Sequence, residues 1–94
     1  MVDNYKIKIK VISQKGSCAA GHKVGDEWVI PAGKTPEGIC LPAFALLYPS
    51  IRTLTYGGEF PWETDKDATT ACCSDAVNPV VFEMKRIKKE NSDI

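Results

Sequence analysis

Apolar and polar residues alternate along two parts of the chain, near its beginning and near its end. Between residues 5 and 11 the apolar positions are Tyr5, Ile7, Ile9 and Val11, with lysines between them. That period is typical of a β-strand with one face in the core and the other in water. Residues 80–87 repeat it less regularly, and the period assigns to one face Val80, Phe82, Met84 and Arg86. We therefore predict a first and a last strand at these positions.

A further strand and one helix are predicted between these two. Residues 27–30 form a short run closed by Pro31 and Gly33, and we expect it to pair with the first strand through a long loop. Pro42 suits the first turn of a helix, whereas Pro49 predicts a kink or a division into two short helices. The helical spacing gives one apolar stripe, which comprises Phe44, Leu47, Tyr48, Ile51 and Leu54 or Thr55.

Together these elements predict an α+β fold, a small antiparallel sheet or partly open barrel with one kinked helical segment packed on it. Residues 1–87 are assigned to a single domain and residues 88–94 to a polar C-terminal tail. The polar and acidic stretch 64–70 is expected to be a surface loop. Phe60 and Trp62 have two interpretations, as caps of the core or as a surface for a partner.

Composition and charge narrow the function classes. Twelve basic residues balance twelve acidic ones, so we expect no general electrostatic attraction to nucleic acid or to an anionic membrane. The first residues lack the apolar core of a secretory signal, and no apolar run approaches the roughly 20 residues of a membrane helix. We therefore expect a cytoplasmic protein, where reducing conditions disfavour disulfides and favour metal ligation or thiol chemistry.

The four cysteines are Cys18, Cys40, Cys72 and Cys73. They contain no Cys-x-x-Cys pair, which argues against an ordinary zinc ribbon or a bacterial ferredoxin. Cys18 lies in a loop of small residues, where backbone amides can approach sulfur or inorganic sulfide. Cys40 precedes the predicted helix, whose free amide groups and dipole stabilise a thiolate. Because adjacent cysteines rarely reach one centre, we expect one of Cys72 and Cys73 to be a ligand, and the residues alone favour Cys72 only narrowly.

We predict that Cys18, Cys40 and Cys72 bind a cofactor, preferably an iron–sulfur cluster of the four-iron type and otherwise zinc. The candidates for a fourth ligand are Cys73, His22, Asp75 and an external molecule. Such a protein would transfer electrons to a redox partner or bind a small molecule at the open position of its cluster.

Four segments carry a family resemblance: GSCAAGHKVGDEW, TPEGICLPAFALLYP, LTYGGEFPW and ACCSDAVNPVVFEMKRI. Over nearly the whole chain they resemble a family of short, uncharacterised, cysteine-containing proteins found mainly in anaerobic bacteria and archaea. The positions that match the family pattern are Cys18, Gly21, Gly25, Asp26, Gly38, Cys40, Tyr56, Gly57, Gly58 and Cys72. A proline commonly follows the last cysteine in relatives, so Cys73 departs from the pattern and the resemblance favours Cys72 as the functional thiol. The anaerobic distribution is compatible with an oxygen-sensitive cluster and implies no particular activity.

Three alternatives need no cluster. The cysteines can be buried structural residues that pack as small hydrophobic groups. The chain can instead be a non-enzymatic interaction module or homo-oligomer that uses Phe60, Trp62 and a sheet edge. Finally, Cys40 can be the nucleophile of a thiol enzyme or a sulfur carrier. The residues assign no catalytic group, so the sequence leaves open whether the protein is an enzyme.

Overall fold

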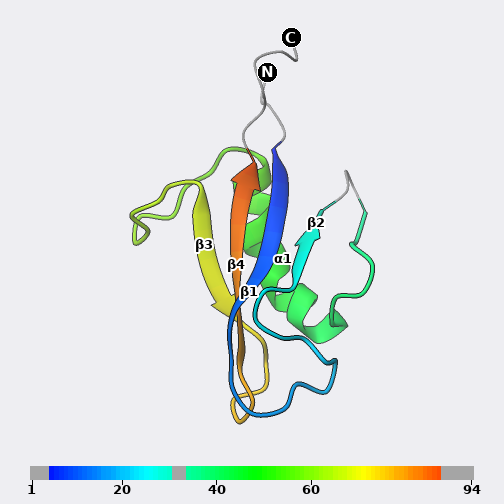
Figure 1. Ribbon diagram of the computed structural model, residues 1–94. Coiled ribbons are helices and arrows are strands. Elements are labelled where there is room, and N and C mark those ends of the chain that lie inside the picture. The colour runs from blue at the N-terminus through cyan, green and yellow to red at the C-terminus, as the bar shows by residue number, and fades with distance from the viewer. Residues whose placement is uncertain (1–4, 31–33, 88–94) are drawn as a thin grey trace.

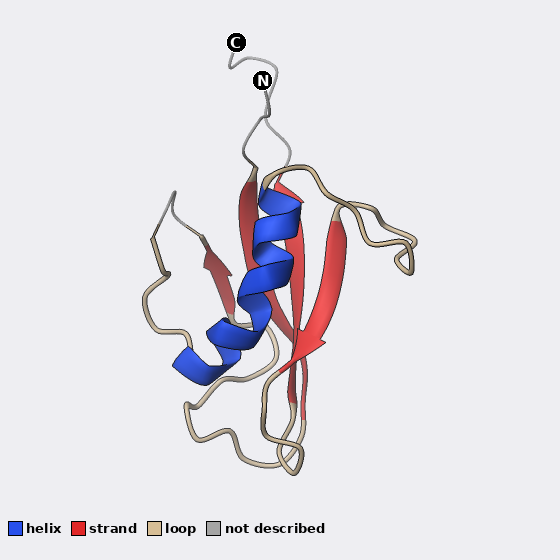
Figure 2. Cartoon of the chain, turned by 180° about the vertical axis from the view of Figure 1, so that it is seen from behind, coloured by secondary structure: helices blue, strands red, loops and turns tan. Residues whose placement is uncertain are grey.

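The computed structural model describes residues 5–30 and 34–87. Its elements follow in the order β1 (Lys6–Gln14), β2 (Glu27–Val29), α1 (Leu41–Thr55), β3 (Ala68–Cys72) and β4 (Val80–Ile87). The strands form one antiparallel sheet in the order β2-β1-β4-β3, and α1 lies across one of its faces (Figures 1 and 2). The end strands β2 and β3 do not pair with each other, so the sheet is open. The predicted α+β fold is confirmed in its sheet form rather than as a barrel.

The two alternating segments build the sheet side of the core. The buried residues of β1 and β4 on the face toward α1 are Ile7, Ile9, Val11, Val80, Phe82, Met84 and Arg86. The two strands pair from Lys6 opposite Ile87 onward, with an irregularity between Val11 and Ser13. Because successive side chains of a strand alternate between faces, the lysines of β1 lie on the opposite, solvated face. The predicted pairing of β1 with the short strand β2 is also confirmed.

The helix α1 begins at Leu41, one residue before the predicted start, and continues past Pro49 to Thr55. Proline has no N–H for the helical hydrogen bond, and Figure 2 shows the helix axis bending along its length, as predicted. The buried residues of α1 are Ala43, Leu47, Ile51 and Leu54. Tyr48, which the sequence placed in the buried stripe, is 44% exposed. It follows Leu47 by one residue, about 100° around the helix, and therefore faces the side of the molecule.

The strand β3 corrects a prediction. The sequence indicates a surface loop over residues 64–70, but Ala68–Cys72 is an edge strand that pairs with β4 from Lys85 to Val81. Its sequence, ATTAC, has no alternation of large apolar side chains. The neighbouring strand β4 supplies the pairing that makes it a strand, which is a tertiary effect that local patterning does not report.

In the loop after α1, the two aromatic residues that the sequence left ambiguous differ in burial. Phe60 is partly buried against the core cluster, as expected of a cap. Trp62 is 72% exposed and packs on Phe60 with ring centroids 5.2 Å apart, so it does not cap the core. The predicted tail, residues 88–94, lies outside the described residues. Within the described part of the chain, no helix has the length and apolar character needed to cross a membrane.

Candidate functional site

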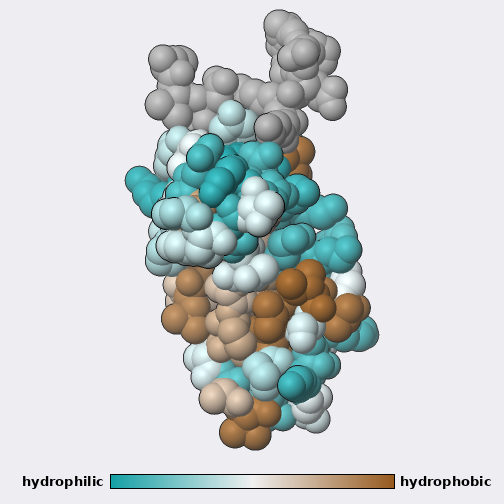
Figure 3. Space-filling model, turned by 90° about the vertical axis from the view of Figure 1, so that its left-hand side faces the viewer, coloured by the Kyte–Doolittle hydropathy of each residue, from teal (hydrophilic) through white to brown (hydrophobic). Residues whose placement is uncertain are grey.

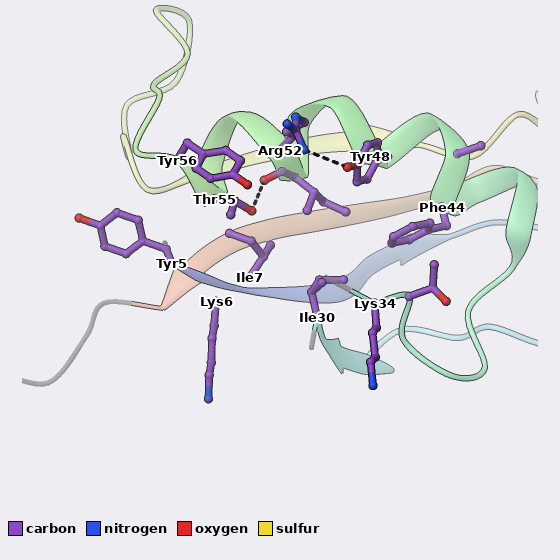
Figure 4. Close-up of a pocket in the computed structure, with 13 residues that line it drawn as sticks. Tyr5, Lys6, Ile7, Ile30, Lys34, Phe44, Tyr48, Arg52, Thr55 and Tyr56 are labelled. Atoms are coloured by element: carbon purple, nitrogen blue, oxygen red, sulfur yellow. Dashed lines mark hydrogen bonds between the residues drawn. The ribbon is translucent and has the colours of Figure 1, made fainter. Parts of the chain in front are cut away.

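A groove of about 820 Å³ lies between α1 and the part of the sheet next to β2 (Figure 4). Its position follows from the way the helix is seated. The helix packs on β1, β3 and β4 but not on β2. A gap therefore remains between α1 and the β2 end of the sheet, and its volume lies in the range of pockets that hold small molecules.

The floor of the groove is apolar and continuous with the core. It is formed by Ile7 of β1, Ile30 just after β2, and Phe44 and Ile51 of α1. Ile7 and Ile51 are buried members of the core cluster, whereas Phe44 and Ile30 are partly buried against it. An apolar group placed on this floor would be removed from water, which is favourable in proportion to the area covered.

The rim of the groove combines aromatic and cationic side chains, and none of the described residues that line it is acidic. The aromatic hydroxyls come from Tyr5, Tyr48 and Tyr56, and the cations are Lys6, Lys34 and Arg52. Figure 4 shows Arg52 and Tyr48 together on the helix side, whereas Lys6 and Lys34 extend from the sheet side, away from α1. The lysine stems line the groove, and Arg52 is the cation on the helix wall.

Arg52 is held by two aromatic neighbours on its own helix. Its Nη1 donates a hydrogen bond to the hydroxyl of Tyr48 at 3.3 Å, and its guanidinium carbon lies 5.3 Å from the centre of the Tyr56 ring. The hydrogen bond with Tyr48 raises the pKa of Arg52, so the side chain keeps its charge. Arg52 makes no ion pair with any described residue, in contrast to four other cations of the chain: Lys8, Lys10, Lys85 and Arg86.

The predicted cysteine ligands lie around the start of α1 and the end of β3, at the opposite end of the sheet from the start of β1 and the end of β4 (Figure 1). All four cysteines are free thiols. Cys18, Cys40 and Cys73 are partly buried against the same core cluster. The loop that carries Cys18 is fastened to the turn before β4, since the Ser17 amide donates to Asn78 Oδ1 at 3.0 Å. The fold therefore brings these three segments to one end of the core.

Cys72 and Cys73 face opposite ways at the end of β3. Cys72 is exposed and pairs with Val81, whereas Cys73 packs toward the core and its Sγ accepts the Val80 amide at 3.3 Å. Partial desolvation of the sulfur, and then the neighbouring Cys73 thiol, raise the pKa of the Cys72 thiol. Cys73, rather than the favoured Cys72, is the residue on the side of the sheet where Cys18 and Cys40 pack.

His22 has a structural partner. It is 7% exposed, and its Nε2 accepts the backbone N–H of Cys40 at 3.0 Å. Its ring also meets Trp28 edge-on at 4.9 Å. The histidine therefore links the Cys18 loop to the start of α1, and its Nε2 is occupied as the acceptor of the Cys40 N–H.

These residues do not form a ready-made cluster site. Across residues 5–30 and 34–87, no three histidine, cysteine or carboxylate side chains are grouped so that they could hold a metal ion. Cys72 faces away from Cys18 and Cys40, and the nitrogen of His22 is engaged. The cluster therefore stays a prediction from the sequence, with a chemical test given below.

A third feature is an apolar surface on the β3 side of the molecule. Figure 3 shows apolar side chains gathered in a band below a hydrophilic upper region. This surface suits the interaction module that the sequence left open, but its shape indicates no particular partner.

Comparisons with protein-family models, with curated proteins and with solved structures found no match to this chain. Of the three features, the groove is the one for which the described residues form both a floor and a rim. Its residues come from three separate parts of the chain, and the sequence signalled it only weakly. The one local sign was the i, i+4 pair of Tyr48 and Arg52, which meet on one side of a helix.

Proposed function

We propose that this protein binds a small, largely apolar molecule in the groove between α1 and the β2 end of the sheet. The observation that carries the proposal is a volume of about 820 Å³ over a floor of core residues. Ligand sites typically combine such an apolar floor with a few polar groups that set orientation. Here the polar groups are the tyrosine hydroxyls of the rim and Arg52 on the helix wall.

The ligand class follows from what the groove offers. The floor residues Ile7, Ile30 and Phe44 offer only apolar surface, so the body of the ligand is expected to be aromatic or aliphatic. The tyrosine rings of the rim can pack along its sides, because aromatic groups supply large contact areas with few rotatable bonds. A cytoplasmic location, as expected from the sequence, is retained as part of this proposal.

A neutral fluorescent probe, N-phenyl-1-naphthylamine, tests the proposal directly. Its emission should rise on binding with a one-to-one stoichiometry. Ala45 lines the groove and is exposed, so Ala45→Trp should fill the space without disturbing the core. Leu46→Trp places the same side chain at the next helical position, which does not line the groove, and serves as the matched control.

We expect Ala45→Trp to weaken probe binding about tenfold or more, and Leu46→Trp to leave it unchanged. Near-ultraviolet circular dichroism should show that both variants keep the native fold. No probe binding by the wild type, or equal binding by both variants, would overturn the proposal.

The iron–sulfur centre of Cys18, Cys40 and Cys72 is kept as a second proposal, with zinc as its alternative. It is favoured by one observation, that the Cys18 loop, the start of α1 and the end of β3 lie at one end of the core (Figure 1). Protein purified without oxygen would contain iron and acid-labile sulfide, and Cys73→Ala would retain them while Cys72→Ala would not. Equal loss in both variants would reject the three-cysteine set.

A further inference from the structure

We infer that the ligand of the groove is a free amphipathic acid whose oxyanion head is bound by Arg52 and Tyr48. The inference rests on the proposed function, because it concerns the same groove, and it adds the charge of the ligand and the residues that recognise it. It starts from the composition of the rim, where Arg52 is the cation on the helix wall and none of the described lining residues is acidic.

Arg52 has hydrogen-bond donors that its described neighbours do not use. A guanidinium group has five N–H donors, and in the described part of the chain the side chain of Arg52 makes a single hydrogen bond, to Tyr48. The side chains of Lys8, Lys85 and Arg86, by contrast, have carboxylates within ion-pair distance. Arg52 is thus a cation with donors available at the mouth of an apolar groove.

The guanidinium of Arg52 is oriented by two neighbours on its own helix. Tyr48 and Arg52 are four residues apart on α1 and meet on its surface. The hydrogen bond to Tyr48 and the contact with the Tyr56 ring restrict the guanidinium from two sides. Because the Tyr48 hydroxyl accepts from Arg52, its own proton is free to be donated elsewhere. The pair can therefore present N–H and O–H donors to one carboxylate, sulfonate or phosphate group.

The place for the anionic head of the ligand adjoins the apolar floor that would bury its body. Tyr48, Arg52 and Ile51 are neighbours on α1, and all three line the groove. An oxyanion at Arg52 thus lies beside the apolar floor, where the rest of the molecule would be buried. This arrangement selects a molecule with one anionic end and an apolar body, free in solution, because the site is a groove between helix and sheet rather than a flat face.

Two probes of nearly the same shape separate this inference from the proposed function. N-phenyl-1-naphthylamine is neutral, and 1-anilinonaphthalene-8-sulfonate carries the same ring system with a sulfonate. We expect the wild type to bind the sulfonate about tenfold more tightly than the neutral probe, as a charge-assisted hydrogen bond allows. Added salt should reduce that preference, because the rim is exposed to solvent.

Arg52→Gln should abolish the preference for the sulfonate, measured as the ratio of the sulfonate affinity to the neutral-probe affinity in the same variant. Tyr48→Phe should reduce the preference in the same way, and Lys23→Gln, which removes the charge of a residue that does not line the groove, should not change it. Equal affinity of the wild type for both probes, or an unchanged preference in Arg52→Gln, would overturn the inference and leave the proposed function standing. If the neutral probe does not bind at all, the proposed function falls and this inference falls with it.

Discussion

Arg86 and Asp67 form a partly buried ion pair, in which Nε of Arg86 donates to Oδ1 of Asp67 at 3.0 Å. The same guanidinium donates to the carbonyl oxygens of Leu54, Gly58 and Lys66, at 3.0, 2.9 and 2.7 Å. Leu54 belongs to the last turn of α1, and the other two follow the helix. One side chain of β4 therefore holds the end of the helix and the connection after it against the sheet.

This arrangement predicts that Arg86→Met strongly destabilises the protein. The substitution keeps an unbranched chain of similar length but removes the guanidinium from Asp67 and from three carbonyl groups. Breaking a buried, hydrogen-bonded ion pair costs about 3–5 kcal/mol, and urea unfolding followed by far-ultraviolet circular dichroism would measure it.

The control lies one residue away on the other face of the same strand. Lys85 pairs with Asp65 at 3.2 Å, but the two side chains are 54% and 50% exposed. Exposed pairs of this kind contribute about 0–1 kcal/mol, so Lys85→Met should change the free energy of unfolding little. Similar losses in the two variants would show that Arg86 does not organise the end of α1.

A second prediction concerns two glycines of the Cys18 loop. Gly16 and Gly21 have φ angles of +68° and +79°, so alanine is strained at either position. A Cβ at residue 16 would also overlap the side chain of Asn78, which accepts the Ser17 amide, whereas a Cβ at residue 21 meets nothing within 4 Å. We expect Gly21→Ala to cost about 1–2 kcal/mol and Gly16→Ala clearly more.

The comparison is made by thermal and urea unfolding of the two variants side by side. The excess cost of Gly16→Ala reports the attachment of the Cys18 loop to the turn before β4. If both alanines cost the same, that attachment contributes nothing beyond backbone strain.

The sequence predicted those parts of the fold in which the polarity of each side chain indicates whether it is buried or exposed. The alternation in β1 set Ile9 apart from the lysines, and that in β4 grouped Arg86 with Phe82 on one face; the structure buries all three residues. The strand β3 was not predicted because Thr69 and Thr70 resemble loop residues in sequence. They form a strand because they pair with β4. Local patterning cannot report such a partner.

Contacts between distant parts of the chain also explain why the groove and the inward-facing cysteine were not predicted. The groove joins Tyr5, Ile30 and Arg52, which are far apart in sequence, so no spacing rule brings them together. The cysteines did gather at one end, but the alternation of side chains along β3 turned Cys73 and not Cys72 toward the core. A motif can favour one of two adjacent residues, whereas the strand register decides which one faces inward.

A third prediction tests the structural role assigned to His22. Replacing it by phenylalanine keeps a ring beside Trp28 but removes the nitrogen that accepts the Cys40 amide. A part-buried N–H without an acceptor costs about 1–3 kcal/mol, so His22→Phe should lower the free energy of unfolding by that amount. Hydrogen exchange at the Cys40 amide should accelerate as well, and exchange at an unchanged rate would exclude the hydrogen bond as the cause. Lys23→Ala, at the exposed neighbouring position, is the control.

A fourth prediction follows from the turn before β4. Hydrogen bonds from the backbone and side chain of Asn78, and then from the Val77 amide, lower the pKa of Asp75. A carboxyl group whose pKa is lower in the folded state stabilises the fold fully above its unfolded value, about 3.9. That contribution is lost as the pH falls through the lower folded value.

Asp75→Asn removes the titrating group and keeps one oxygen acceptor. The stability difference between wild type and variant should therefore be largest at neutral pH and should shrink as the pH falls below about 4. Chemical unfolding at a series of pH values between neutrality and the acid range would measure it. Parallel curves for the two proteins would mean that the charge of Asp75 adds nothing to the turn.

A fifth prediction distinguishes the exposed thiol at the end of β3 from its inward neighbour. The pKa of Cys72 is raised by partial desolvation and by Cys73, so its thiolate is scarce at neutral pH despite its exposure. The thiolate is the nucleophile in alkylation. Cys73→Ala removes one of the two causes, and we expect Cys72 to react faster with iodoacetamide in that variant than in the wild type. Peptide mass spectrometry can follow each cysteine separately, and Cys18→Ala should leave the Cys72 rate unchanged. A slower or unchanged Cys72 rate in Cys73→Ala would contradict this prediction, because Cys73 would then not be raising the pKa of Cys72.

The same experiment reports on Cys40. Modification of Cys40 in metal-free protein would support a nucleophilic role for it, whereas its protection would remove the thiol-enzyme alternative.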